Sequence, residues 1–175
     1  SLNISKEKNI LIKLWKELNK KTFLMSNDII VLSQAMKKQL LKTESKILKK
    51  IHVIPSWCDT ETIIPRAKSN NWFAYKYNLV NKFTVIYSGN QGRCHDIITI
   101  IKAAEILLEK KDIVFLFIGN GYQNQSIKKI ALNLKLNNCI FLDYQNREDL
   151  PFSLSSADLA MVTLNKDSEG FVAPS

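Results

Sequence analysis

The sequence predicts an α/β fold, a Rossmann-like, doubly wound parallel sheet that is truncated at its C-terminal end. Apolar runs of strand length alternate with helical segments along the second half of the chain, which indicates right-handed β-α-β units. One run, I-V-F-L-F-I at residues 113–118, is apolar on both faces. Such a strand is typical of a parallel sheet with helices on both sides. We expect a truncation because the chain stops soon after a fourth predicted strand, with nothing that ends a domain.

The first 60 residues are predicted to form a helix, a strand, a second helix and a second strand. Apolar positions at i, i+3, i+4 and i+7 indicate one face of the first helix, and they are Leu11, Leu14, Trp15 and Leu18. The D-I-I-V-L run at 28–32 suits a buried strand, and Ser33 offers an N-cap for the helix that follows. The I-H-V-I run at 51–54 predicts the second strand, which a proline stops.

Residues 56–82 are irregular and polar, and we place an interdomain linker at 61–82. Beyond it, apolar runs predict strands at 84–87, 113–118, 140–142 and 159–164. Apolar positions at helical spacing predict three helices between these strands, and they include Ile97, Ile100, Ile101, Ala104, Leu108, Ile127, Ile130, Ala131, Leu134, Leu150, Leu154 and Ala157. The last helix tolerates Pro151 because a proline fits the first turn of a helix.

The composition, 46% hydrophobic and 23% charged, suits one globular domain, or one domain with a piece of another. Because no uninterrupted run of about 18 apolar residues exists, no membrane-spanning helix is expected, and no secretory leader is recognisable. The three cysteines, Cys58, Cys94 and Cys139, form no C-x-x-C pair. We therefore expect neither a disulfide framework nor a zinc site, and the simplest compartment is a reducing cytoplasm.

The formal net charge of +9 is unevenly placed, because residues 1–60 hold 12 lysines against 5 acids (+7) and residues 61–175 hold 13 bases against 11 acids (+2). The two stretches therefore resemble parts of different modules. One alternative that this charge leaves open is a non-catalytic, basic Rossmann-like module that binds a nucleotide, nucleic acid or an anionic membrane surface. The lysines interleave with an apolar helical face, however, which is typical of a solvated surface, so no nucleic-acid partner is expected.

Ligands of open α/β sheets bind at the carboxyl ends of the strands, where the loop at 88–96 holds suggestive residues. Gly89 and Gly92 allow a close approach of backbone to a ligand, and the following helix supplies N–H groups and the positive end of its dipole. Arg93 offers several donors suited to phosphate, and His95 offers one more. The alternative is a tight turn with a solvent-exposed arginine, because G-x-x-G is a weak motif.

Other nucleotide and metal sites are disfavoured by the motifs that are missing. Neither G-x-G-x-x-G followed by an acid after the second strand nor G-x-x-x-x-G-K-[ST] occurs. The loop at 119–122 suits an ordinary turn, whereas Tyr144 and Gln145 lie in a loop that could meet a base, or that ends in a helix N-cap at Asn146. The nearby carboxylates of the loop at 166–171 have no histidine beside them in sequence, so we assign no metal.

Five further segments accompany the run K-F-T-V-I-Y-S-G-N-Q-G-R-C-H-D at 82–96. They are I-I-V-L-S-Q-A-M at 29–36, I-H-V-I-P-S-W-C-D at 51–59, F-L-F-I-G-N-G at 115–121, A-D-L-A at 157–160 and E-G-F-V-A-P-S at 169–175. In this order and spacing they resemble the family-four retaining glycosyltransferases of GT-B fold. The resemblance is strongest to the bacterial branch that builds capsule, exopolysaccharide and O-antigen.

The resemblance implies that residues 1–60 are the last strand-helix units of an N-terminal acceptor domain, and that residues 83–175 are an incomplete C-terminal domain for the nucleotide-sugar donor. It implies transfer of a sugar from a nucleotide-diphosphate sugar to a hydroxyl of a lipid-linked or growing polysaccharide acceptor. The configuration would be retained and no metal or cofactor used. The location implied is cytoplasmic, with peripheral contact to the inner face of an anionic membrane, and this fragment alone is expected to be inactive.

The resemblance also assigns site residues by position. Those for the donor diphosphate are Gly89, Asn90, Gly92, Arg93 and His95, those for the base are Tyr144 and Gln145, and those for the transferred sugar are Glu169, Gly170 and Phe171. Glu169 and Arg93 are the implied catalytic residues, because a cation at the leaving diphosphate stabilises the transition state. Asn90 stands where many relatives carry arginine. The glutamate expected to hold the ribose would fall beyond Ser175.

Overall fold

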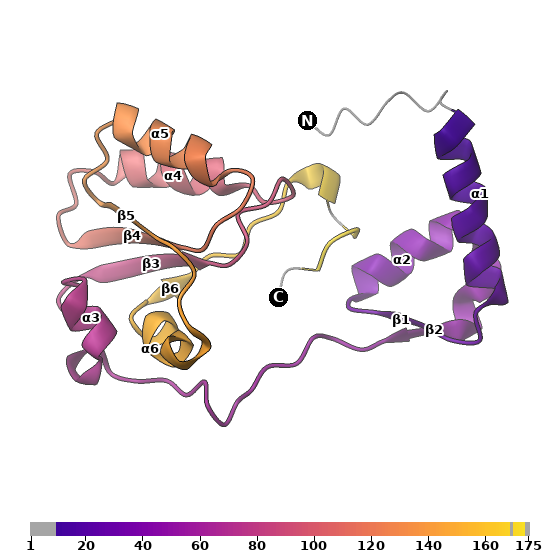
Figure 1. Cartoon of the computed structure of the whole chain (residues 1–175), viewed down its shortest axis with the longest axis horizontal. Coiled ribbons are helices and arrows are strands. Elements are labelled where there is room, and N and C mark those ends of the chain that lie inside the picture. Colours follow the sequence, from indigo (N-terminus) through magenta and orange to yellow (C-terminus); the bar gives the residue numbers. More distant parts are fainter. Residues whose placement is uncertain (1–9, 169, 174–175) are drawn as a thin grey trace. The chain divides into compact units, whose positions relative to one another are not determined.

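The computed structural model describes residues 10–168 and 170–173, which form two compact units (Figure 1). One unit comprises residues 1–57 with 166–175, and the other comprises residues 58–165. In the second unit, four parallel strands line up in the order β5-β4-β3-β6. They are β3 (Phe83–Ser88), β4 (Ile113–Ile118), β5 (Cys139–Leu142) and β6 (Leu159–Ala160).

The order of these strands is that of half a dinucleotide-binding fold, because the first strand lies between the second and the fourth. The direction of winding reverses between β3 and β6, and such a switch point is where open α/β sheets bind their ligands. The prediction of a Rossmann-like, doubly wound sheet is therefore confirmed.

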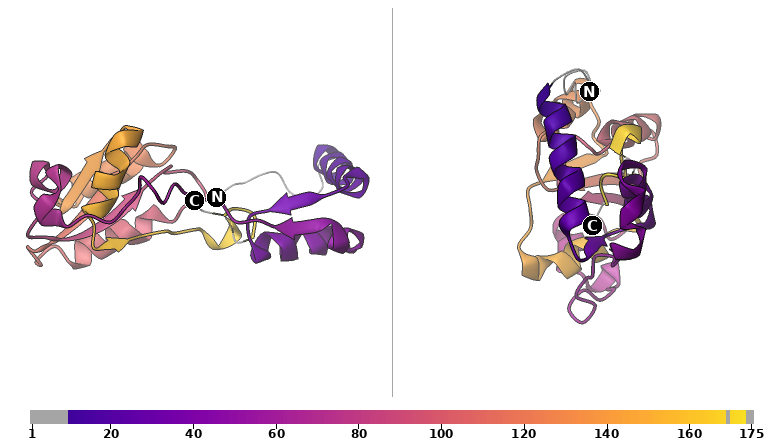
Figure 2. Two further views of the ribbon diagram at one scale, coloured as in Figure 1. Left: turned by 90° about the horizontal axis from the view of Figure 1, so that it is seen from below. Right: turned by 90° about the vertical axis from the view of Figure 1, so that its right-hand side faces the viewer.

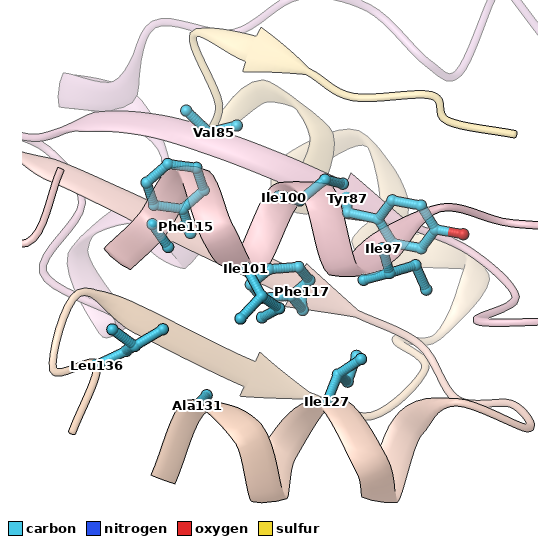
Figure 3. Close-up of a cluster of buried hydrophobic side chains, with 11 residues drawn as sticks. Val85, Tyr87, Ile97, Ile100, Ile101, Phe115, Phe117, Ile127, Ala131 and Leu136 are labelled. Carbon is cyan, nitrogen blue, oxygen red and sulfur yellow. The ribbon is translucent and has the colours of Figure 1, made fainter. Parts of the chain in front are cut away.

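Helices cover both faces of this sheet (Figure 1). On one face lie α4 (Ile97–Ile106) and α5 (Asn124–Asn133), and on the other lie α3 (Trp72–Lys76) and α6 (Leu150–Ser155). Alternate residues of the strands point to the two faces, as strand geometry requires. Figure 3 shows the first core, which contains Val85, Tyr87, Ile97, Ile100, Ile101, Phe115, Phe117, Ile127, Ala131 and Leu136. The second core contains Phe73, Ala74, Leu79, Ile86, Leu116 and Ile118.

The stretch predicted as a linker contains ordered structure that the sequence pattern did not indicate. A 3-10 turn at Lys68–Asn70 leads into α3, and Asn71 caps this helix by accepting a hydrogen bond from the Phe73 N–H at 3.0 Å. Phe73 and Leu79 are fully buried against the sheet. A helix of five residues is too short to show a hydrophobic period, so only its long-range packing reveals it.

The fourth strand is shorter than predicted, since β6 holds two residues rather than the six of 159–164. Among the described residues β6 pairs only with β3. The hydrogen-bonded ladder therefore ends where these two strands diverge. Residues 161–165 continue as a loop, and the Asn165 N–H donates to the carbonyl of Cys94 at 2.9 Å. The end of β6 is thereby bound to the loop that follows β3.

An ion pair holds the amino ends of β3 and β6. The Lys68 ammonium pairs with Asp158 and donates to the Lys82 carbonyl at 2.7 Å, while the Thr84 N–H donates to the Asp158 carboxylate at 2.7 Å. Partial burial opposes ionisation of Asp158, but the bonds from Lys68 and Thr84 outweigh it and lower the pKa of this carboxyl. The A-D-L-A segment thus has a structural role here.

The other unit contains a parallel pair, β1 (Ile29–Val31) and β2 (Ile51–Val53), with α1 (Ile10–Met25), α2 (Gln34–Thr43) and a 3-10 helix at Ser45–Lys50. Helix α2 runs alongside the strand pair (Figure 2). The predicted N-cap is confirmed, because Ser33 accepts a hydrogen bond from the Met36 N–H at 3.2 Å. The buried core of this unit consists of Val31, Ile47 and Ile51.

Candidate functional site

Three loops meet at the carboxyl ends of the strands of residues 58–165. They follow β3 at 89–96, β4 at 119–123 and β5 at 143–146. The Gly89 N–H donates to the Ile118 carbonyl at 2.9 Å, so the first loop leaves β3 while still bonded to the end of β4. The strand order favours ligand binding at these loops, because open α/β sheets bind ligands at the carboxyl ends of their strands.

Glycines allow the first two loops to touch backbone to backbone. A Cβ atom at Gly119 would lie 2.1 Å from the Gly89 carbonyl oxygen, and one at Gly121 would lie 2.8 Å from the Gln91 backbone. Both glycines have positive φ, +121° and +147°, which other residues adopt only with strain. A Cβ at Gly89 (φ +142°) would meet nothing within 4 Å, so this side of the loop faces open space.

A buried amide joins the same two loops. Gln91 is fully buried and accepts a hydrogen bond from the Asn124 side chain at 2.8 Å. Its own Nε2 donates to the Gly119 carbonyl at 3.4 Å, and its backbone N–H donates to the Asn120 carbonyl at 2.8 Å. Because buried polar groups need partners, these bonds hold the two loops in one arrangement.

Arg93 is exposed on this loop, and its guanidinium carbon lies 3.7 Å from the centre of the Tyr122 ring. The backbone beneath it is fixed, because the Asn165 side chain donates to the Arg93 carbonyl at 2.7 Å. The loop after β6 therefore supports the loop after β3 at the switch point. Among the described residues, none accepts a hydrogen bond from the Arg93 guanidinium, so its donors are available to a ligand.

His95 lies deeper than Arg93. Its Nδ1 atom is buried and has no hydrogen-bond partner among the described residues, while its ring packs edge-on against Tyr87 at 6.1 Å between centroids. Gln123 fixes the backbone by donating to the carbonyls of His95 at 2.8 Å and Gly92 at 2.5 Å. Nδ1 is therefore shielded from solvent, whereas Asn90 on the same loop is exposed.

Tyr87 supports the same loop from the end of β3. Burial, with a smaller effect from Tyr144, raises the pKa of Tyr87 to about 12. The hydroxyl is therefore a donor at neutral pH, and it donates to the Asn90 carbonyl at 2.8 Å.

The N-terminus of α4 is already capped. Asp96 accepts hydrogen bonds from the Thr99 N–H at 3.3 Å and from the Thr99 hydroxyl at 2.7 Å. This carboxylate uses part of the helix dipole and weakens the attraction of the helix end for another anion. Arg93 and the loop N–H groups are therefore the main attractions for a phosphate here.

The loop after β5 reaches the same group. The Tyr144 hydroxyl donates to the Asn120 carbonyl at 3.2 Å, and its ring would lie 3.2 Å from a Cβ at Gly119. The Gln145 side chain turns back to donate to the Asp143 carbonyl at 2.8 Å. The residues predicted for a diphosphate and for a base thus lie on two loops, after β3 and after β5, and both loops contact the loop after β4.

A comparison with protein families identifies the domain to which these loops belong. The family model described as "Glycosyl transferases group 1" matches residues 71–173, more than half of the chain. The chain belongs to the glycosyl transferases group 1 family. The match starts at α3 and takes in the whole four-stranded sheet, so the three loops are part of the family domain. The glycosyltransferase resemblance predicted from the sequence is confirmed.

Two curated bacterial glycosyltransferases are similar to this chain. The probable glycosyltransferase WbjE of Pseudomonas aeruginosa is 26% identical over 175 residues, which cover 98% of this chain and 42% of WbjE. The putative colanic acid biosynthesis glycosyl transferase WcaI of Escherichia coli K12 is 30% identical over 95 residues, 54% of this chain and 23% of WcaI. The chain therefore spans less than half the length of these relatives.

Solved structures share the fold of this chain. HepE of Anabaena, crystallised with UDP and glucose, gives a TM-score of 0.69 at 15% identity and covers 85% of this chain and 40% of its own. WaaG, described as a glycosyltransferase involved in lipopolysaccharide biosynthesis, gives a TM-score of 0.66 at 15% identity, covering 88% of this chain and 45% of its own. At such identities the likeness establishes the architecture alone.

Three residues predicted for the transferred sugar lie at the end of this group 1 match. Gly170 (φ +77°) packs on α2, because a Cβ there would lie 3.2 Å from the Ala35 carbonyl oxygen. Phe171 is 64% exposed, and Glu169 lies outside the described residues. Gly170 and Phe171 line a pocket of about 410 Å³ together with Ala35, Lys38, Gln39, Lys42, Lys166 and Asp167. These residues belong to the unit of residues 1–57 and 166–175.

Within residues 10–168 and 170–173, no three His, Cys, Asp or Glu side chains gather as metal ligands would. No helix there is long and apolar enough to cross a membrane.

Proposed function

We propose that this chain carries the donor-binding part of a glycosyltransferase that moves a sugar from a nucleotide-diphosphate sugar to a hydroxyl, with retention of configuration and without a metal. The observation that carries the proposal is an exposed arginine, Arg93, at the switch point of a group 1 domain, on a loop that contacts the loops after β4 and β6. HepE, which shares this fold, was crystallised with UDP. That supports a uridine diphosphate donor as the first to test.

In this proposal the guanidinium of Arg93 and the backbone N–H groups near Gly89 meet the diphosphate. As the bond between the sugar C1 and the diphosphate oxygen breaks, the bonding electrons stay with the diphosphate, and a cation placed there lowers the barrier. The acceptor hydroxyl oxygen forms the new bond to C1, and its proton passes to the departing diphosphate. Tyr144 and Gln145 are proposed for the base, and Glu169 with its two neighbours for the sugar.

The acceptor proposed is a lipid-linked or growing polysaccharide. The names of WcaI and WaaG support this class, since they refer to colanic acid and lipopolysaccharide biosynthesis. A cytoplasmic enzyme with peripheral membrane contact fits the basic first 60 residues, whose exposed lysines include Lys13, Lys16, Lys21, Lys38, Lys42, Lys46 and Lys49. Each lysine near an anionic surface contributes about 1 kcal/mol of attraction.

The test of the donor site is calorimetric titration of the chain with UDP, GDP and uridine. We expect binding that depends on the diphosphate and that falls about tenfold or more in Arg93→Ala, because a charge-assisted hydrogen bond contributes about 1.5–3 kcal/mol. Lys110→Ala is the matched control, since it removes one exposed cation just before β4, at the opposite edge of the sheet. A chain that binds no diphosphate, or an equal loss in both variants, contradicts the proposal.

Membrane contact has its own measurement. Adsorption of the chain to vesicles that contain anionic lipid should weaken as salt rises, because ions screen charges over about 10 Å at 0.1 M. Neutral vesicles are the control. Adsorption that is absent, or that salt does not change, would remove the membrane from the proposal.

A further inference from the structure

Arg93 and Tyr122 come from different loops, and they meet face to face. Arg93 follows β3, Tyr122 follows β4, and 3.7 Å separates the guanidinium carbon from the ring centre. The ring is 69% exposed, so burial does not explain its position. Stacking of an arginine on an aromatic face is attractive because the ring carries a partial negative charge on its faces.

This contact orients the guanidinium without occupying its N–H donors. The five N–H donors of an arginine lie in the guanidinium plane. A ring against the face of that plane therefore leaves the edge free for phosphate oxygens, which prefer to be bound in pairs. A long exposed side chain otherwise loses rotational entropy when it binds, which weakens the interaction. A ring that already orients Arg93 reduces this loss.

Hydrogen bonds on both sides of Tyr122 fix the backbone that carries its ring. On one side of Tyr122, Gly121 donates its N–H to the Asn120 side chain at 2.8 Å. On the other side, Gln123 donates its backbone N–H to the Gln91 carbonyl at 2.9 Å. The loop that presents the ring is thus fixed to the loop that presents the arginine.

We propose that Tyr122 is a positioning residue, whose ring holds the Arg93 guanidinium ready for the donor diphosphate. This inference rests on the proposed function and adds to it a residue that acts through Arg93 rather than on the ligand. It differs from a role as a stacking surface for the base, which is an outcome of the test.

The experiment compares Tyr122→Leu with Tyr122→Phe in the whole 175-residue chain, by NMR titration with UDP and with uridine. Leucine keeps apolar bulk but lacks an aromatic face, whereas phenylalanine keeps the face. We expect Tyr122→Leu to weaken UDP about threefold, as the loss of an exposed cation–π contact predicts, and Tyr122→Phe to stay within about 1.5-fold. Uridine affinity should not change. Tyr75→Leu is the matched control, because Tyr75 is a tyrosine on α3 that is 59% exposed, against 69% for Tyr122.

Each other result overturns the inference in a recognisable way. A similar loss for uridine means that the ring touches the base. An equal loss in the leucine and phenylalanine variants means that the hydroxyl acts. Unchanged UDP binding in Tyr122→Leu means that Arg93 needs no support. If the unmodified chain binds neither UDP nor GDP, the proposed function fails and this inference fails with it. Thermal unfolding of both variants checks that the fold is kept.

Discussion

Different forces hold the sheet at its carboxyl edge, where the strands end, and at its amino edge, where the strands begin. At the carboxyl edge, Gly119 packs against the Gly89 carbonyl and the buried Gln91 amide bridges two loops, so the contacts are neutral. At the amino edge, the ion pair of Lys68 and Asp158 joins β3 to β6. The difference teaches that the Gly119 and Gln91 contacts join the loops of the candidate site without an ion pair. The arginine of this site therefore remains available to a ligand.

Gly119→Ala should disrupt the contact between the loops after β3 and β4, at the carboxyl edge. Of the substitutions considered, it should lower the free energy of unfolding most. The added methyl would collide with the Gly89 carbonyl at 2.1 Å, and φ at +121° strains any side chain. We expect a loss of about 3 kcal/mol or more in the free energy of unfolding, measured by denaturant titration.

Gly89→Ala is the matched control for that collision, since φ is +142° but a Cβ would meet nothing within 4 Å. Only the backbone strain remains, which costs about 1–3 kcal/mol. Equal losses in the two variants would show that the close approach of the loops contributes nothing.

Asp158→Asn tests the ion pair with Lys68 at the amino edge of the sheet. It should lower the free energy of unfolding less than Gly119→Ala does. The folded-state pKa of Asp158 is lowered, so the stability from its ionised form is full above the unfolded value of about 3.9. It is lost as the pH falls through the lowered folded value. The unmodified chain should therefore lose stability in acid, and Asp158→Asn should be less stable near neutral pH with a weaker acid dependence.

The control for this pH series is Asp112→Asn, which removes an exposed carboxylate that forms no side-chain hydrogen bond among the described residues. Unfolding by urea is followed at several pH values for the three chains. If Asp158→Asn and Asp112→Asn give parallel curves, the ion pair at the amino edge does not contribute to acid stability.

The elements that the sequence predicted well are those with a local signal. β4 is apolar along its length, and the serine before α2 is a strong N-cap, so both were located. β6 was predicted too long because the ladder depends on a neighbouring strand rather than on its own residues. Helix α3 was missed for the same kind of reason, since Phe73 is recognised as core only through its contact with the sheet.

The residues of the candidate site likewise fall into those that the sequence predicted and those that it did not. Arg93 and the glycines of its loop follow from the position of a loop after a strand and from the family resemblance. Gln91 and Tyr122 were missed, because a glutamine in a polar loop is usually exposed, and a stacked ring depends on a partner 29 positions away in the chain. Such pairings arise only when the sheet brings the ends of β3 and β4 together.

The three thiols of the chain differ in a way that has a practical use. Cys58 is exposed, whereas burial raises the pKa of Cys139 in β5 to about 12. Because reagents attack the thiolate, Cys139 should resist alkylation at a pH where Cys58 reacts. With Cys94 replaced, a single fluorescent reporter can therefore be attached at Cys58 without disturbing the interior of the sheet.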